Sequence, residues 1–155
     1  YELLGEKVRQ LGGDDFVLGS TDAGRAKWVE TMANQIGVEA AFILKRRMQN
    51  GDTEVLALNA KVEGRTVVIY DDMIRSGGSL ISAAKAYHQA GATQLIAVAT
   101  HGLFTNGALD RLNRSGLFQA VVCTDSHPIA KSSDNPLLEV VSCAPVFADE
   151  LHIVL

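Results

Sequence analysis

Short apolar runs alternate with amphipathic stretches along almost the whole chain. The clearest run, Thr66–Tyr70, is followed by a helical pattern over Leu80–Ala90 that stops at Gly91. A continuous apolar run is typical of a strand covered on both faces, and repeated strand–helix alternation is typical of a mostly parallel α/β sheet with helices on both faces. The strands predicted in this way are Phe16–Ser20, Ala40–Lys45, Glu54–Leu58, Thr66–Tyr70, Gln94–Ala99, Ala120–Thr124 and Leu138–Val141. The predicted helices are Glu2–Leu11, Gly24–Ile36, Leu80–Ala90, Gly107–Arg114 and Pro145–Leu151.

One pair of strands departs from this alternation. The polar segment Arg46–Asp52 joins Ala40–Lys45 directly to Glu54–Leu58, which predicts a hairpin with a flexible tip. The segment contains Asn50-Gly51 and only Met48 as an apolar side chain. We therefore expect it to be mobile when no ligand is bound.

Composition narrows the class of protein. The chain has 155 residues, of which 47% are apolar and 21% are charged, which suits one globular domain over residues 1–155. The net charge of −4 argues against a general nucleic-acid binder, and no apolar stretch is long enough to span a bilayer. Cys123 and Cys143 lie in apolar contexts without a paired ligand spacing, so we expect both to fill core positions in a reducing cytoplasm.

Polar segments follow the predicted strands. In open α/β sheets, ligands bind beyond the carboxyl ends of the strands, so these segments should meet at one edge. Between them, the polar segments carry carboxylates, cations and glycine turns. The segments are Thr21–Gly24, Lys45–Arg47, Asp71–Ser79, Thr100–Gly102 and Thr124-Asp125. The sequence therefore predicts the functional site at this edge.

The segment Asp71–Ser79 is the most informative of these. Ser76–Ser79 joins a strand to a helix, so its backbone N–H groups can converge on an anion, and its glycines permit the close approach that this needs. Asp71 and Asp72 suit hydrogen bonds from vicinal sugar hydroxyls, or Mg²⁺ with its waters. The segment ends neither like a Walker A loop nor like a dinucleotide-binding loop. A sugar phosphate is the predicted ligand; the simpler interpretation is a turn with Ser76 or Ser79 as the helix N-cap and with solvated aspartates.

The segment Val67–Ser79 resembles the motif that binds phosphoribosyl pyrophosphate (PRPP) in type I phosphoribosyltransferases and PRPP synthetases. That motif has four apolar residues, two acids, two apolar residues and D-T-G/A-G-T, and Met73-Ile74 favours the synthetases. Other segments resemble the synthetase family in the same order along the chain. They are Asp22-Ala23-Gly24 (P-D-A-G-G), Lys45–Arg47 (K-R-R), Ala99–Gly102 with Ala108–Leu112 (A-T-H-G…A-x-x-R-I) and Val141–Pro145 (S-V-A-P).

The resemblance to the ribose-phosphate pyrophosphokinase (PRPP synthetase) family implies a type I phosphoribosyltransferase-like fold. It implies pyrophosphate transfer from MgATP to the C1 hydroxyl of ribose 5-phosphate, giving PRPP and AMP for nucleotide biosynthesis. It further implies Mg²⁺ as cofactor, ATP, ribose 5-phosphate and PRPP as ligands, and a homo-oligomer. The amino-terminal ATP-binding half of these synthetases has no counterpart here. We therefore expect the chain to be the carboxyl-terminal half, which alone should not catalyse the reaction efficiently.

The resemblance also implies roles for single residues. Asp22 would help to bind Mg²⁺, although it could serve only as a helix N-cap. Lys45 and Arg47 would be catalytic and would neutralise charge on the polyphosphate in the transition state, although such clusters are often merely solvated. His101 could contact the nucleotide or could hold a structural turn. The expected ribose-phosphate-binding residues are Asp71, Asp72, Arg75, Ser76, Gly77, Gly78 and Ser79.

Several positions depart from the family pattern. Arg25 stands where the family has the second glycine after Asp22, and Arg75 stands where the loop has an aspartate. Ser76 and Ser79 replace threonines and keep the hydroxyls. Two further interpretations stay open: a type I phosphoribosyltransferase, which would consume PRPP, and a non-catalytic regulatory member of the synthetase family.

Overall fold

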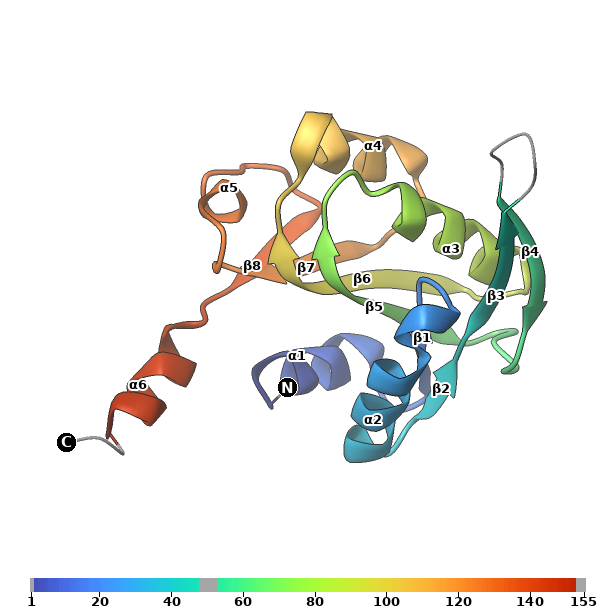
Figure 1. Cartoon of the computed structure of the whole chain (residues 1–155), viewed down its shortest axis with the longest axis horizontal. Coiled ribbons are helices and arrows are strands. Elements are labelled where there is room, and N and C mark those ends of the chain that lie inside the picture. The colour runs from blue at the N-terminus through green and yellow to red at the C-terminus, as the bar shows by residue number, and fades with distance from the viewer. Residues whose placement is uncertain (1, 48–52, 153–155) are drawn as a thin grey trace.

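The computed structural model describes residues 2–47 and 53–152, which form a six-stranded sheet with helices on both faces (Figure 1). The strand order is β2-β1-β5-β6-β7-β8, and each neighbouring pair is parallel. The predicted α/β class is therefore confirmed. The strands of this sheet are β1 (Phe16–Ser20), β2 (Glu39–Ala41), β5 (Thr66–Ile74), β6 (Gln94–Gly102), β7 (Ala120–Thr124) and β8 (Leu138–Val141).

Two apolar clusters hold the layers together, one on each face of the sheet. Along β5, Val67 and Ile69 belong to the first cluster, and Val68 and Tyr70 belong to the second. Successive side chains of a strand point to opposite faces, so a strand covered on both faces must be apolar throughout. Helices α3 (Gly78–Gln89), α4 (Ala108–Ser115) and the short α5 (Pro128–Lys131) contribute to the first cluster, and α1 (Glu2–Gly12) and α2 (Ala26–Ile36) contribute to the second.

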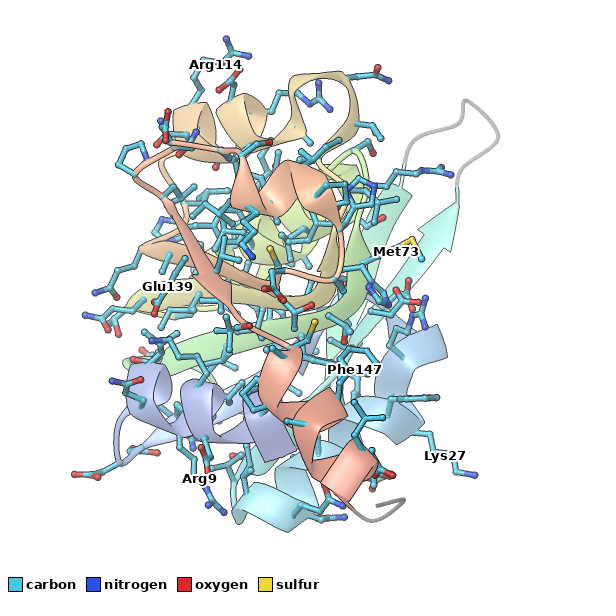
Figure 2. All side chains as sticks on the ribbon, turned by 90° about the vertical axis from the view of Figure 1, so that its left-hand side faces the viewer. Arg9, Lys27, Met73, Arg114, Glu139 and Phe147 are labelled. Atoms are coloured by element: carbon cyan, nitrogen blue, oxygen red, sulfur yellow. The ribbon has the colours of Figure 1, made fainter. Side chains whose placement is uncertain are left out.

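The last helix, α6 (Ala144–His152), extends away from the sheet (Figure 1). Its Val146, Phe147 and Leu151 are exposed, and Figure 2 shows Phe147 on the outside of this helix. Within residues 2–47 and 53–152, no helix is both long enough and apolar enough to cross a membrane. Cys123 is buried as predicted and Cys143 is half-buried, and both are free.

Two strands continue beyond the apolar pattern that predicted them. β5 includes Asp71–Ile74 and β6 includes Thr100–Gly102, because these ends pair with each other, Asp71 opposite Ala99 and Met73 opposite His101. Ladder hydrogen bonds satisfy the backbone whatever the polarity of the side chains. The acidic pair Asp71–Asp72 therefore lies on a strand, where the sequence pattern had predicted a loop.

The predicted hairpin is confirmed, but its first strand is divided. The single predicted strand Ala40–Lys45 splits at Phe42 into β2, which joins the main sheet, and β3 (Ile43–Arg47), which pairs antiparallel with β4 (Thr53–Leu58). Phe42 belongs to neither ladder: its backbone N–H donates to the side-chain oxygen of Asn59 at 2.5 Å, and its carbonyl oxygen accepts from the backbone N–H of Asn59 at 3.3 Å. The expectation of a mobile tip falls on residues 48–52, which lie outside the described residues.

Tyr87, on α3, connects the helix to the carboxyl ends of two strands. Its side chain is fully buried, and its hydroxyl donates to the carbonyl oxygens of Ser20 (2.9 Å) and Ala41 (3.1 Å). Burial raises the pKa of Tyr87, so the hydroxyl keeps its proton. A Cβ atom on Gly19 would lie 2.9 Å from the Tyr87 ring, which shows how closely the helix approaches β1.

We expect Tyr87→Phe to lower the free energy of unfolding by about 1–3 kcal/mol, because two buried carbonyl oxygens lose their donor. Urea denaturation followed by circular dichroism measures the loss. Tyr70→Phe is the matched control, since its hydroxyl pairs with the Thr100 hydroxyl at 3.0 Å, a partner that can rotate toward another acceptor. Equal losses in the two variants would show that the carbonyl contacts of Tyr87 have no special weight.

Candidate functional site

The segment between β5 and α3 forms a small cavity at the carboxyl edge of the sheet. Its volume is about 120 Å³, and it is lined by Asp71 and by Met73–Leu80. Gly77 is the N-cap of α3 and has a left-handed backbone with φ of +77°. Because the cap residue has no side chain, it makes no side-chain hydrogen bond to the first turn, and neither Ser76 nor Ser79 is the N-cap that the simpler interpretation expected. A helix amino terminus of this kind is suited to bind an anion.

Two neighbouring segments fix the backbone of this cradle, which we define as Arg75–Ser79. Arg111, on α4, donates through Nη2 to the carbonyl oxygen of Ser76 at 2.7 Å. The backbone N–H and the hydroxyl of Thr105 donate to the carbonyl oxygen of Arg75 at 2.9 and 3.2 Å. The carbonyl groups of the cradle are thus held by protein donors. Arg111 is the arginine of the A-x-x-R-I resemblance, and the sequence alone had not indicated this contact.

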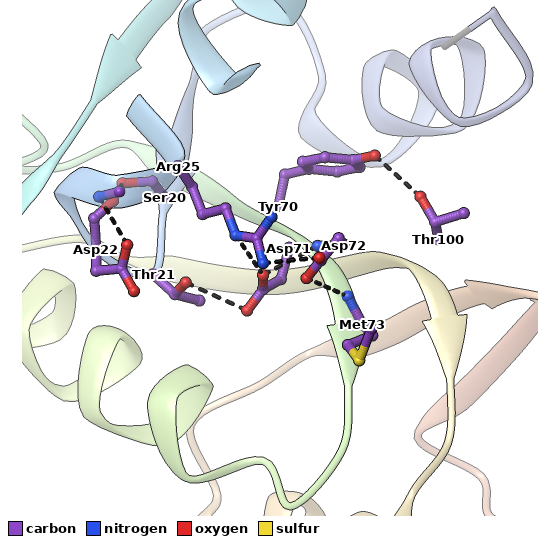
Figure 3. Close-up of polar contacts among 10 residues, drawn as sticks. Ser20, Thr21, Asp22, Arg25, Tyr70, Asp71, Asp72, Met73 and Thr100 are labelled. Carbon is purple, nitrogen blue, oxygen red and sulfur yellow. Dashed lines mark hydrogen bonds and ion pairs between the residues drawn. The ribbon is translucent and has the colours of Figure 1, made fainter. Parts of the chain in front are cut away.

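Asp71 and Asp72 lie beside the cradle and face the turn that follows β1 (Figure 3). The carboxylate of Asp71 accepts from the Thr21 hydroxyl at 3.2 Å and from the N–H of Asp72 at 2.9 Å. The carboxylate of Asp72 accepts from the N–H of Met73 at 2.8 Å. Arg25 Nη2 lies 2.7 Å from Asp72 Oδ2, and Arg25 Nε lies 3.7 Å from Asp71 Oδ1. Burial raises the pKa of Asp71, and the charge of Asp72 raises it further.

Asp22 lies in the same turn and caps the short helix η1 (Ala23–Arg25). Its Oδ1 accepts from the N–H of Gly24 at 2.8 Å, which confirms the capping role for one carboxylate oxygen. Its metal-binding role stays a prediction. Among the described residues, no three or more His, Cys, Asp or Glu side chains are grouped so that they could hold a metal ion. The protein side chains described here do not by themselves make a complete Mg²⁺ site.

The structure describes only part of the remaining predicted site residues, which are Lys45, Arg47 and His101. The backbone of Lys45–Arg47 belongs to β3, which lies beside η1, but the side chains of these residues are outside the described part of the chain. The catalytic roles of Lys45 and Arg47 thus stay predictions. The Nδ1 atom of His101 lies 2.7 Å from the Ser126 hydroxyl, so a structural contact is present and a nucleotide contact stays a prediction.

Asp125, which follows β7, has a structural role in the folded chain. Its carboxylate accepts from the N–H of Cys143 at 2.8 Å and from the Ser142 hydroxyl at 3.1 Å. These bonds, the backbone one above all, lower the pKa of Asp125 to about 2. Asp125 thus attaches the segment before α6 to the sheet, and β6 lies between its strand and β5, which carries the acidic pair.

The chain is similar in sequence to one protein family and to several ribose-phosphate pyrophosphokinases. The family described as phosphoribosyl synthetase-associated domain matches residues 22–149. A ribose-phosphate pyrophosphokinase of Methanopyrus kandleri is 39% identical over 152 residues, which cover 97% of this chain and 50% of that protein. One of Parasynechococcus marenigrum is 37% identical over 139 residues, covering 89% of this chain and 42% of that protein. The chain thus spans about half the length of these relatives, or less.

Solved structures agree with this comparison. The phosphoribosylpyrophosphate synthetase of Mycobacterium smegmatis superposes with a TM-score of 0.85 at 32% identity, over 99% of this chain and 49% of that one. An APRTase of Giardia lamblia superposes with a TM-score of 0.61 at 14% identity, over 81% of this chain and 80% of that one. At such low identity the second likeness shows the fold alone, which is that of phosphoribosyltransferases.

Proposed function

This chain belongs to the phosphoribosyl synthetase-associated domain family, and from that premise we propose that it forms the ribose-phosphate site of a ribose-phosphate pyrophosphokinase. The observation that carries the proposal is the cavity between β5 and α3, which is lined by Asp71 of the acidic pair and by the glycine-capped terminus of the helix. A sugar phosphate presents a dianion and vicinal hydroxyls, and these are the groups that such a pair of surfaces can bind.

In the proposed reaction, the C1 hydroxyl oxygen of ribose 5-phosphate attacks the β-phosphorus of ATP and loses its proton. The bond from the β-phosphorus to the oxygen of the α-phosphate breaks, so AMP leaves and PRPP remains. Catalysis of such a transfer consists mostly of positioning and of charge stabilisation. Ser76–Ser79 would hold the 5-phosphate, with Arg75 beside it. Lys45 and Arg47 would neutralise charge on the polyphosphate.

Asp71 and Asp72 would orient the ribose. Each carboxylate oxygen has two lone pairs, so both side chains keep acceptor capacity for sugar hydroxyls alongside their contacts in the protein. The carboxylate of Asp22 would help to hold Mg²⁺, which would neutralise charge on the ATP phosphates. The proposed site lies on one domain, residues 1–155, and the amino-terminal ATP-binding half of the synthetases has no counterpart in it. A homo-oligomer in the cytoplasm is part of the same proposal.

We expect the 155-residue chain to bind ribose 5-phosphate weakly and to make no PRPP at a useful rate. Calorimetric titration measures the binding, and a coupled assay of AMP release measures turnover, with a full-length ribose-phosphate pyrophosphokinase as positive control. Absence of binding would contradict the ribose-phosphate site. Sustained AMP release by these residues alone would show that the ATP site lies within this chain.

One observation favours a second candidate, a non-catalytic member of the family. Arg25 pairs with Asp72 and approaches Asp71, and both carboxylates would have to serve the sugar in an active enzyme. Joining the chain to the ATP-binding half of the Methanopyrus kandleri relative and assaying AMP release separates the candidates. Activity supports the pyrophosphokinase, and ligand binding without activity supports the regulatory subunit.

A further inference from the structure

The turn that follows β1 determines where Arg25 lies relative to the acidic pair. Asp22 caps η1 and so sets the turn from which Arg25 projects. Thr21, in the same turn, bonds to Asp71, so the turn and the end of β5 are attached at two points (Figure 3). The neighbouring cation Lys27 projects away into solvent (Figure 2). Arg25 is thus directed at the carboxylates by the fold.

This ion pair contributes little to stability. The side chains of Arg25 and Asp72 are 41% and 40% exposed, and pairs as exposed as this one are worth little in measured cycles. Asp71, at 14%, is the more buried carboxylate, and it lies next in the chain to a second negative charge. What Arg25 supplies is a fixed positive charge against two adjacent carboxylates.

A divalent cation bound to the same carboxylates would have to occupy the space that the guanidinium of Arg25 takes beside them. Mg²⁺ takes oxygen ligands at close range, and a guanidinium within hydrogen-bonding distance of one carboxylate repels it. With the guanidinium of Arg25 at 2.7 Å from Asp72, the acidic pair does not fit a resident divalent cation.

We propose that Arg25 is the built-in counter-ion of Asp71 and Asp72, in the place that a divalent cation would take at this pair. Arg25 then determines how the site recognises its ligand: a sugar phosphate enters the cradle without a divalent cation bound to the two carboxylates. The part of this inference that concerns the sugar phosphate rests on the proposed function, and the part that concerns the cation does not.

Titration with Mn²⁺ tests the cation directly and needs no sugar phosphate. Paramagnetic broadening of the amide resonances around Asp71 and Asp72 reports a cation bound at the pair. The wild type should show no broadening there at Mn²⁺ concentrations that broaden these resonances in Arg25→Gln and Arg25→Gly. We expect both variants to gain at least about tenfold in Mn²⁺ affinity, and Arg25→Lys to behave like the wild type.

Lys27→Gln is the matched control, because it removes the same charge two positions further along without touching the carboxylates. It should leave the Mn²⁺ response of the wild type unchanged. Broadening at Asp71 and Asp72 in the wild type at the same Mn²⁺ concentration as in Arg25→Gln would overturn the proposal. So would an equal gain of affinity in Lys27→Gln, since general electrostatics would then explain the effect.

Calorimetric titration with ribose 5-phosphate, in EDTA and in Mg²⁺, tests the consequence for the ligand. Wild-type affinity should be the same in both, and Arg25→Gln should bind at least about tenfold more tightly in Mg²⁺ than in EDTA. A wild type that binds only in Mg²⁺ would overturn the inference. A wild type that binds in neither would contradict the proposed ribose-phosphate site, while the Mn²⁺ titration would still decide the role of Arg25.

Discussion

Gly77→Val is expected to weaken the binding of ribose 5-phosphate by at least about a hundredfold. Gly77 has φ of +77°, which a β-branched residue adopts only under strain, and a Cβ atom there would lie 3.4 Å from the side chain of Leu112. Relief of the strain moves the cradle, and its N–H groups lose their alignment on the phosphate. Hydrogen bonds to a charged group are worth about 1.5–3 kcal/mol each, so losing two costs roughly two to four orders of magnitude in affinity.

Calorimetric titration measures this loss, with thermal unfolding to show that the variant is folded at the temperature of the titration. Gly116→Val is the matched control. Gly116 follows α4 with φ of +63°, and apart from its two chain neighbours no described residue has a heavy atom within 4 Å of a Cβ placed there. It therefore has the same backbone strain without the cradle. If Gly77→Val kept its affinity, or if Gly116→Val lost as much, the cradle would not be the phosphate site.

Arg75→Asp is expected to weaken ribose 5-phosphate binding by about one to two orders of magnitude. Arg75 lines the cavity, and a guanidinium can give two parallel, charge-assisted hydrogen bonds to phosphate oxygens. The sequence also allows that Arg75 points to solvent or pairs with a nearby acid such as Asp72. In the structure Arg25 takes that position, and Arg75 makes no ion pair with any described residue. Arg75 is therefore available to the phosphate.

Titrations at low and at moderate salt measure the effect. Arg75→Gln should fall between the wild type and Arg75→Asp, since it removes the charge without reversing it. Lys61→Asp, an exposed charge reversal before β5 at the opposite edge of the sheet, controls for net charge and should leave the affinity unchanged. Equal or tighter binding of ribose 5-phosphate by Arg75→Asp would show that Arg75 does not bind the phosphate, and the loss of the family's aspartate would then indicate lost function.

Much of the fold follows from local features of the sequence. Apolar runs and helical periods are short-range signals, and they placed β1, β7 and β8 with the observed bounds and located α1 to α4 within a few residues. The site edge could also be predicted, because every strand of a parallel sheet ends at the same side and polar segments follow those ends. The anion-binding turn of the cradle could be predicted for a similar reason, because the turn that its glycines permit depends only on neighbouring residues.

Other features depend on which segments meet in space. β5 continues through Asp71 and Asp72 because β6 pairs with it there, and side-chain polarity alone had suggested a loop. Arg25 was visible in the sequence only as a departure from a family pattern. Its pairing with Asp72 arises because β1 lies next to β5, which brings the turn after β1 to the end of β5. Strand order and register set such distances between residues remote in the chain, and no local pattern contains them. Local patterns therefore predicted the architecture and the edge that carries the site, and the strand order and register of the folded chain set which charges meet there.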